Sequence, residues 1–339
     1  MRYKLLVVGT DGSATARVTE EVAMSVARGV GAEVLFVSAY EKDDLRPDAE
    51  RTAEAAGARA AAAGATARSD VAQGDPASVI VEMADRAEAD LIVVGDAAMG
   101  KRRRVGLGGV ADRVSHAMPC DTLIVRSAKQ RGPGWSHGKV LLATDGSSTA
   151  SHAVRVGAEL ARGVGAAMEI IHVKDEVMGA LIMQESAVLT GGHDVPGHRL
   201  TGGDVGKSIA DTAADFDLVV VGNKGMSGSV RMFMGKVPDA VSHLAPCDVL
   251  IVNTVDRSLS EVAPGEGAVV TVDGKKVAAF REQDGSPVLL SPRCQHLGCT
   301  VGWNEAAGTW DCPCHGSRYD PYGKVIQGPA SRDLSPATT

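Results

Sequence analysis

An internal repeat occupies about the first three quarters of this 339-residue chain and constrains its fold more than any other feature. Residues 11–13, Asp-Gly-Ser, recur at 145–147, and VSHAMPCDTLIV at 114–125 recurs as VSHLAPCDVLIV at 241–252. Residues 132–134, Gly-Pro-Gly, mark a linker between the copies. A repeat of this length indicates two structural units of one kind, one after the other.

Each copy alternates short runs of Val, Leu and Ile with helical segments. In the first copy this pattern predicts strands at residues 5–9, 34–37 and 91–95 and helices at 14–30 and 78–89. Strands that alternate with helices form right-handed crossovers and a parallel sheet covered on both faces. We therefore expect an α/β fold with two doubly wound, Rossmann-like domains in tandem, at residues 1–130 and 137–254.

The remaining segment, residues 258–335, carries a different pattern. Short β runs at 269–272, 276–280 and 288–290 are separated by Asp-Gly turns at 273–274 and 284–285. This spacing predicts a small antiparallel all-β domain after the two α/β domains.

The composition excludes several functional classes. Hydrophobic residues make up 44% of the chain but aromatic residues only 3%, which suits small-residue helices packed on parallel strands. The formal charge of −7 argues against a general nucleic-acid surface or an anionic membrane surface. No stretch approaches the ~18 uninterrupted apolar residues that span a bilayer, and the first residues show no signal-peptide pattern. We therefore expect a cytoplasmic protein with no nucleic-acid or membrane partner.

Two short loops near the C-terminus each offer Cys and His residues. Residues 294–299 read Cys-Gln-His-Leu-Gly-Cys, and residues 312–320 read Cys-Pro-Cys-His-Gly-Ser-Arg-Tyr-Asp. Two thiolates on one iron and two imidazoles on the other suit a 2Fe-2S cluster that accepts one electron at a higher potential than an all-Cys cluster. A structural zinc site is the alternative, because such loops also hold zinc in tetrahedral geometry. Zinc leaves the other cysteine of each loop and the nearby hydroxyl residues without a role.

These loops resemble those of the Rieske family. The resemblance implies four cluster ligands, Cys294, His296, Cys312 and His315. It also implies a disulfide between Cys299 and Cys314 that clasps the loops, and hydroxyl groups of Ser317 and Tyr319 that hydrogen-bond to sulfur atoms. Because such bonds stabilise the reduced form, we expect a potential in the upper part of the roughly −150 to +300 mV Rieske range. Residues 328–330, Gly-Pro-Ala, resemble the loop that covers the cluster.

The repeat resembles the universal stress protein family in its tandem form. The resemblance rests on Asp-Gly-Ser after the first strand, a glycine-rich loop after the fourth strand and Pro-Cys-Asp-x-Leu-Ile-Val in the last strand. Nucleotide-binding members carry three glycines and a hydroxyl residue in that loop, where backbone N–H groups approach phosphates. Copy two keeps Gly222, Gly225 and Gly235 but has Lys236 at the hydroxyl position, whereas copy one lacks the second glycine and the hydroxyl.

The resemblance therefore favours ATP or a related adenine nucleotide in copy two, with copy one as the weaker alternative. Asp145 would lie near the ribose or adenine, and Val173 would offer its backbone to the adenine edge. Lys236 either pairs with a phosphate or fills the site and excludes it. A tight connection with no ligand stays open, because a glycine-rich loop after a strand is a weak signal on its own.

Other repeated residues are expected to be structural. Cys120 and Cys247 precede the last strand of each copy and suit small buried hydrophobic positions. His116 and His243 lie four residues upstream, and we expect helix packing there because one His and one Cys per copy are too few for a metal site. The basic run at 101–104 fits a solvated loop, with a polyanionic ligand as the alternative.

Together the modules predict a cytoplasmic one-electron redox protein whose tandem region binds an adenine nucleotide or a partner and serves redox or stress sensing. We expect an electron carrier or sensor rather than an enzyme, working with a redox partner protein. The alternative is an electron-transfer component of an oxygenase or dehydrogenase system. Homo-oligomerisation stays open, because tandem copies of a family that often dimerises can satisfy that interface internally.

Overall fold

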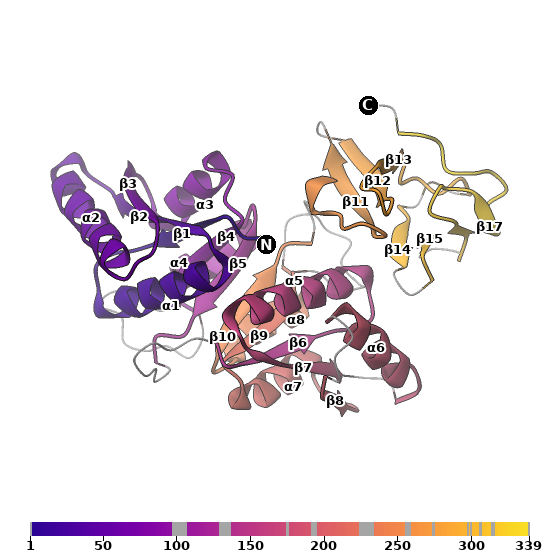
Figure 1. Cartoon of the computed structure of the whole chain (residues 1–339), viewed down its shortest axis with the longest axis horizontal. Coiled ribbons are helices and arrows are strands. Elements are labelled where there is room, and N and C mark those ends of the chain that lie inside the picture. Colours follow the sequence, from indigo (N-terminus) through magenta and orange to yellow (C-terminus); the bar gives the residue numbers. More distant parts are fainter. Residues whose placement is uncertain are drawn as a thin grey trace. The chain divides into compact units, whose positions relative to one another are not determined.

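The computed structural model describes most of the chain (Figure 1). The described residues are 2–96, 107–128, 137–173, 176–190, 195–223, 234–254, 259–272, 275–296, 298, 300–304, 307–312 and 316–337. The chain divides into two compact units, a larger one of Met1–Asp145 with His152–Asn253 and a smaller one of Thr254–Thr339 with Gly146–Ser151. The basic run at 101–104 lies outside the described residues.

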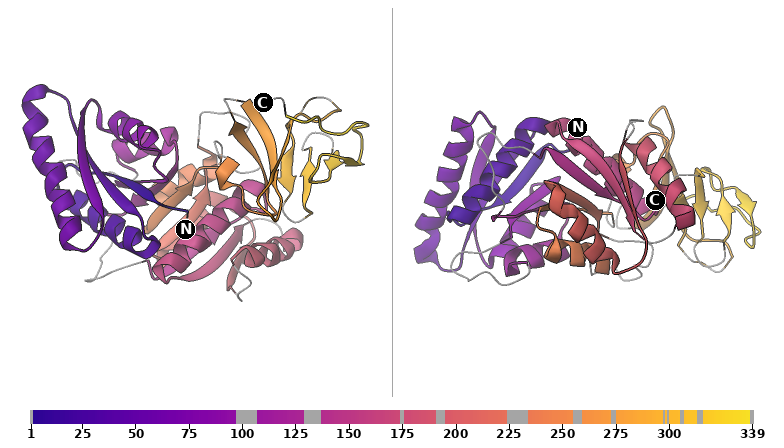
Figure 2. Two further views of the ribbon diagram at one scale, coloured as in Figure 1. Left: turned by 45° about the horizontal axis from the view of Figure 1, so that its top comes forward. Right: turned by 90° about the horizontal axis from the view of Figure 1, so that it is seen from below.

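The larger unit is built on one ten-stranded sheet with the order β3-β2-β1-β4-β5-β10-β9-β6-β7-β8. Figure 2 shows this unit from two further sides, with copy one in indigo to purple beside copy two in magenta to orange. Copy one supplies β1 (Leu5–Gly9), α1 (Ala14–Val30), β2 (Glu33–Tyr40), α2 (Arg46–Ala62), β3 (Ala67–Gln73), α3 (Pro76–Arg86), β4 (Leu91–Gly95), α4 (Gly109–Ala117) and β5 (Asp121–Val125). Copy two supplies β6 (Lys139–Ala143), α5 (Ser148–Val164), β7 (Ala167–Val173), α6 (Glu176–Leu189), β8 (Gly197–Leu200), α7 (Val205–Thr212), β9 (Leu218–Gly222), α8 (Lys236–Leu244) and β10 (Asp248–Val252). The predicted α/β class is confirmed.

Helices cover both faces of this sheet and bury two separate cores. One core joins the sheet to α1, α2 and α5, and the other joins it to α3, α4, α7 and α8. Small residues allow close packing where the two copies meet: a Cβ on Gly29 of α1 would lie 2.9 Å from Val164 of α5, and one on Gly163 would lie 3.0 Å from Val30. The repeated Arg-Gly-Val-Gly segments therefore pack against each other.

The two copies share one sheet because their last strands pair. Within each copy the paired strands run parallel, but β5 and β10 pair antiparallel, with Leu123 opposite Leu250. Each of these strands would otherwise leave a free edge with unpaired backbone groups. From the sequence we expected a separate sheet in each copy. The pairing of β5 with β10 instead joins the two into one mixed sheet.

Two buried aspartates fix this junction. Asp121 and Asp248 are the first residues of β5 and β10 and are fully buried. Asp121 accepts hydrogen bonds from the Tyr3 hydroxyl at 2.8 Å and from the backbone N–H of Asn253 at 2.8 Å. Asp248 in turn accepts one from the backbone N–H of Arg126 at 2.8 Å. Each Pro-Cys-Asp motif therefore anchors the chain just beyond the last strand of the other copy.

Local signals explain why α1 forms where the sequence predicts it. Gly12 has a positive φ of 73°, a conformation that favours glycine. Ser13 is the N-cap and its Oγ accepts a hydrogen bond from the backbone N–H of Ala16 at 3.1 Å. Gly31 ends the helix in the left-handed conformation. The Asp-Gly-Ser motif is thus, first of all, a turn and a helix cap.

The smaller unit has two antiparallel sheets. One is three-stranded, with the order β11-β12-β13, and the other is four-stranded, with the order β14-β15-β16-β17. Their strands are β11 (Gly267–Val272), β12 (Lys275–Arg281), β13 (Pro287–Leu290), β14 (Gly302–Asn304), β15 (Thr309–Asp311), β16 (Arg318–Tyr319) and β17 (Val325–Gln327). Trp303 and Trp310 form the centre of its core, with ring centroids 5.0 Å apart. The predicted small antiparallel β region is confirmed.

Candidate functional site

Two loops at one part of the smaller unit carry the predicted cluster ligands. The first loop joins β13 to β14 and is closed by a backbone hydrogen bond from Val301 to Pro292 at 2.8 Å. The second joins β15 to β16 and is closed by the Cys312 N–H donating to the Ser317 carbonyl at 2.8 Å. Gly298 and Gly316 both have positive φ of 75°, so each loop turns through a glycine.

The predicted thiols are buried beside hydroxyl groups. Cys294 is 2% exposed and Cys312 is 3% exposed, and both are free thiols within the core that also contains Tyr319. The Tyr319 hydroxyl lies 3.1 Å from Cys294 Sγ and accepts a hydrogen bond from the backbone N–H of Gln295 at 3.0 Å. Tyr319 therefore ties its own strand to the first loop.

Hydrogen bonds and burial shift the pKa values of Cys294 and Tyr319 in opposite directions. Burial acts to raise the pKa of the Cys294 thiol, but hydrogen bonds from Tyr319, the His296 backbone and the Cys312 and Ser317 side chains lower this pKa below its usual value. Burial, followed by the bond to Cys294, raises the pKa of Tyr319 to about 12. The hydroxyl consequently keeps its proton and donates it toward sulfur.

Ser317 is fully buried, and its Oγ accepts a hydrogen bond from the backbone N–H of Ala330 at 2.9 Å. This bond anchors the Gly-Pro-Ala segment at 328–330 to the second loop. His296 is exposed, in contrast to the two thiols. His315, Cys299 and Cys314 lie outside the described residues. The disulfide and the ligand roles of all four predicted residues stay predictions.

The residues present fit an iron–sulfur cluster. Two buried free thiols on separate loops, in a pocket with hydroxyl donors, supply the soft ligands and hydrogen bonds that such a cluster uses. One imidazole faces the exterior on the same loop as a buried thiol.

The predicted nucleotide residues of copy two lie around the carboxyl ends of its strands. Val173 and Gly222 are the last residues of β7 and β9, and Asp145 is exposed just after β6. Gly235 caps α8 and donates its backbone N–H to the Asn223 carbonyl at 2.9 Å, so this N–H closes the loop rather than facing a phosphate. Lys236 is exposed at the first position of α8, and Gly225 lies outside the described residues.

Copy one contains a cavity at the corresponding edge. It has a volume of about 170 Å³ and lies where β1 and β4 end, with Gly9, Asp11, Gly95 and Gly108 in its lining. Ligands of open α/β sheets bind at this kind of position, where the strand order reverses. The cavity is smaller than the roughly 300–1,000 Å³ of most small-molecule sites. The sequence favoured copy two, although two glycines of the copy-one loop, Gly95 and Gly108, line this cavity.

The larger unit matches the profile of a known protein family. The profile of the universal stress protein family matches residues 2–126 and 176–253. The chain belongs to the universal stress protein family. The profile of the Rieske [2Fe-2S] domain matches residues 253–337, so this universal stress protein region is fused to a C-terminal Rieske domain, an electron-transfer module.

Two curated relatives of this universal stress protein each match about a quarter of the chain. YhfW of Bacillus subtilis (strain 168), by name a Rieske 2Fe-2S iron-sulfur protein, is 48% identical over 79 residues, which are 23% of this chain and 16% of that protein. The cytochrome b6-f complex iron-sulfur subunit of Nostoc punctiforme is 40% identical over 87 residues, 26% of this chain and 45% of that subunit. The chain thus spans less than half the length of either relative.

A solved structure supports the fold of the universal stress protein region. A universal stress protein from Archaeoglobus fulgidus matches with a TM-score of 0.58 and 21% identity, over 75% of this chain and 99% of that chain. Among the helices that the structure describes, none is both long and apolar enough to cross a membrane.

Proposed function

We propose that the Rieske domain holds a 2Fe-2S cluster through Cys294, His296, Cys312 and His315 and that the protein is a one-electron carrier. When bound, such a cluster accepts and returns one electron at a potential above that of all-Cys clusters. The observation that carries this proposal is the pair of buried free thiols, one of them 3.1 Å from the Tyr319 hydroxyl.

Different side chains of the protein would have different roles at this redox centre. Burial of Cys294 and Cys312 excludes water from the sulfur side, while Tyr319 holds a proton toward Cys294 Sγ. The bond between Ser317 and Ala330 keeps the covering segment in place. Exposed His296 would offer a route to a redox partner. The cytoplasmic location stays a prediction.

Ligand removal tests the proposal. In Cys312→Ser the visible absorption and the EPR signal of the reduced protein should be lost, because the buried thiolate cannot be replaced by a weakly coordinating hydroxyl. Cys247→Ser is the matched control, since Cys247 is an equally buried free thiol in the larger unit. Unchanged absorption in Cys312→Ser would remove the ligand assignment.

We further propose that the stress-protein region binds an adenine nucleotide and couples it to the cluster as a redox or stress sensor. Support comes from the family, from exposed Asp145 and Lys236 at the strand ends of copy two, and from the cavity in copy one. Equilibrium dialysis with ATP tests binding. A change of about 30 mV in the cluster potential with saturating ATP would correspond to about 0.7 kcal/mol of coupling for one electron.

A second function, as an electron-transfer component of an oxygenase or dehydrogenase system, draws support from the similarity to a cytochrome b6-f iron-sulfur subunit. In that case a flavin reductase or another donor should reduce the cluster at catalytic rates, with or without nucleotide. A cluster potential that changes with nucleotide favours the sensor function. Rapid reduction at a rate that does not depend on ATP favours the electron-transfer component.

A further inference from the structure

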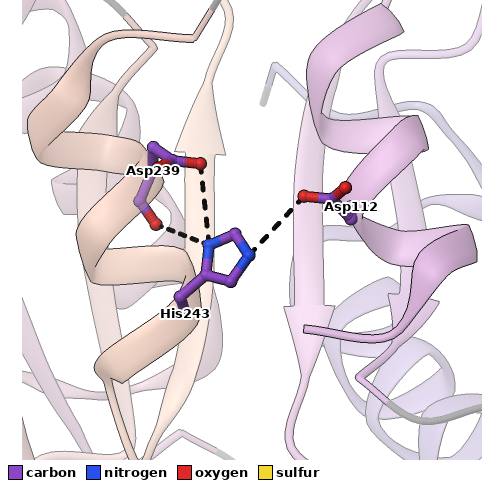
Figure 3. Close-up of side chains that lie close together, drawn as sticks. All are labelled: Asp112, Asp239 and His243. Carbon is purple, nitrogen blue, oxygen red and sulfur yellow. Dashed lines mark hydrogen bonds and ion pairs between the residues drawn. The ribbon is translucent and has the colours of Figure 1, made fainter. Parts of the chain in front are cut away.

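Two aspartates and two histidines meet where the copies of the larger unit face each other. Asp112 and His116 lie on α4 of copy one, and Asp239 and His243 lie on α8 of copy two. Figure 3 shows His243 between Asp239 of its own helix and Asp112 of the other. Donor atoms of Asp112, Asp239 and His243 all lie within 4.8 Å of one another. None of these residues has a role in the proposed electron transfer or nucleotide binding.

The repeat itself builds this cluster. Both helices carry the sequence Asp-x-Val-Ser-His, which places Asp and His four residues apart on one helix face. The antiparallel pairing of β5 with β10 relates the copies by an approximate two-fold axis. His243 Nε2 therefore faces Asp112 Oδ1 at 3.6 Å, and His116 Nε2 faces Asp239 Oδ1 at 3.8 Å.

Hydrogen bonds define which ring nitrogen carries the proton. His116 Nδ1 lies 2.8 Å from the Asp112 carbonyl oxygen, and His243 Nδ1 lies 2.9 Å from the Asp239 carbonyl oxygen. A carbonyl only accepts, so each Nδ1 bears the hydrogen and each neutral ring has its lone pair on Nε2. Both lone pairs then point toward a carboxylate oxygen at a distance too long for a hydrogen bond.

A bound cation would attract both the imidazole lone pairs and the carboxylate oxygens. Two ligand atoms about 2.1 Å from a tetrahedral zinc ion lie about 3.4 Å apart, close to the separations of 3.6 and 3.8 Å across the helices. Imidazole nitrogen and carboxylate oxygen are both zinc ligands, and two carboxylates balance the charge of the ion. Nδ1–H bonded to a carbonyl is also the usual way in which a zinc-bound imidazole is oriented.

We propose that Asp112, Asp239 and His243 bind one Zn²⁺ ion that links α4 to α8 and so links the two copies, with His116 beside the ion as the counterpart of His243 in copy one. The side chains are between 32% and 46% exposed, so the ion can enter from solvent. This site is separate from the cluster ligands, and it gives a function to the histidines for which the sequence suggested only helix packing.

Zinc binding by the full-length, cluster-loaded protein tests this site. After removal of divalent metals, the protein is titrated with ZnCl₂ by calorimetry, and bound zinc is counted by elemental analysis while visible absorption monitors the cluster. We expect one zinc ion per chain. The double variant His116→Gln/His243→Gln should bind zinc at least 10- to 100-fold more weakly, which is the loss of affinity seen when residues around metal sites are replaced. No zinc uptake by the wild type would overturn the site.

A matched control separates this site from other histidines. His198 is 38% exposed and lies 2.6 Å from Glu169, so it is a second exposed His–carboxylate pair on the same unit. His198→Gln should keep the wild-type zinc affinity. Asp239→Asn, a nearly isosteric change on the helix surface, should weaken binding without altering the circular dichroism of the zinc-free protein. Unchanged affinity in both Asp239→Asn and the double histidine variant would contradict the proposal.

Discussion

The Tyr319 hydroxyl gives a quantitative test of how the protein sets the cluster potential. It is fully buried, lies 3.1 Å from Cys294 Sγ and keeps its proton because its pKa is raised to about 12. Reduction adds negative charge that is shared by the ligand sulfurs, so a donated hydrogen bond stabilises the reduced form more than the oxidised form. Tyr319→Phe removes this bond and should lower the potential.

The size of the shift follows from the strength of one hydrogen bond. A net contribution of about 0.5–1.5 kcal/mol, at 59 mV per 1.4 kcal/mol for one electron, gives a fall of about 20–60 mV. An EPR-monitored redox titration measures it. Tyr322→Phe is the control, because Tyr322 is 58% exposed and its hydroxyl bonds to Glu282 at 3.0 Å. A rise in potential in Tyr319→Phe, or an equal fall in Tyr322→Phe, would refute the reasoning.

Three further perturbations probe the fold that supports the sites. Gly267→Ala should lower the free energy of unfolding of the smaller unit by about 1–3 kcal/mol, because its Cβ would clash with the Trp303 ring. Gly302→Ala, where no described atom lies within 4 Å of the added Cβ, should cost much less, and equal costs in urea denaturation would contradict this. Asp121→Ala should destabilise the larger unit by about 3–5 kcal/mol, because it removes a buried carboxylate and leaves its hydrogen-bond donors without an acceptor. An unchanged midpoint of urea denaturation would show that this carboxylate does not stabilise the unit. Burial raises the pKa of Tyr3 well above its usual value, so the stability that Tyr3 contributes is complete below about pH 10 and declines as the pH rises toward the folded-state pKa. Tyr3→Phe should remove this part of the alkaline stability profile, measured by denaturation between pH 8 and 11.

Elements with strong local signals could be predicted from the sequence. The strands at 5–9 and 91–95 and the helix at 14–30 have the predicted bounds, because buried apolar runs and the Ser13 cap specify them locally. The Cys and His spacing likewise predicted the two loops that carry the buried thiols of Cys294 and Cys312. The expected burial is seen for Cys247, at 1% exposure, whereas Cys120 is half-buried.

Features that depend on pairing between the copies were not predicted. The sequence treated each copy as a separate sheet, whereas β5 and β10 join them. Asp112 and His243 are far apart in the chain, and only this strand pairing places them side by side. The signal that could have found them was the repeated Asp-x-Val-Ser-His, read across the copies instead of within one.

Two thiolates and two imidazoles of this chain are proposed to hold the redox centre. Pulsed EPR of the reduced protein measures directly how many histidine nitrogens are coupled to the cluster. We expect two imidazole nitrogens in the wild type and the loss of that signal in His315→Ala. A reduced cluster with no coupled imidazole nitrogen would show all-Cys ligation and contradict the assignment.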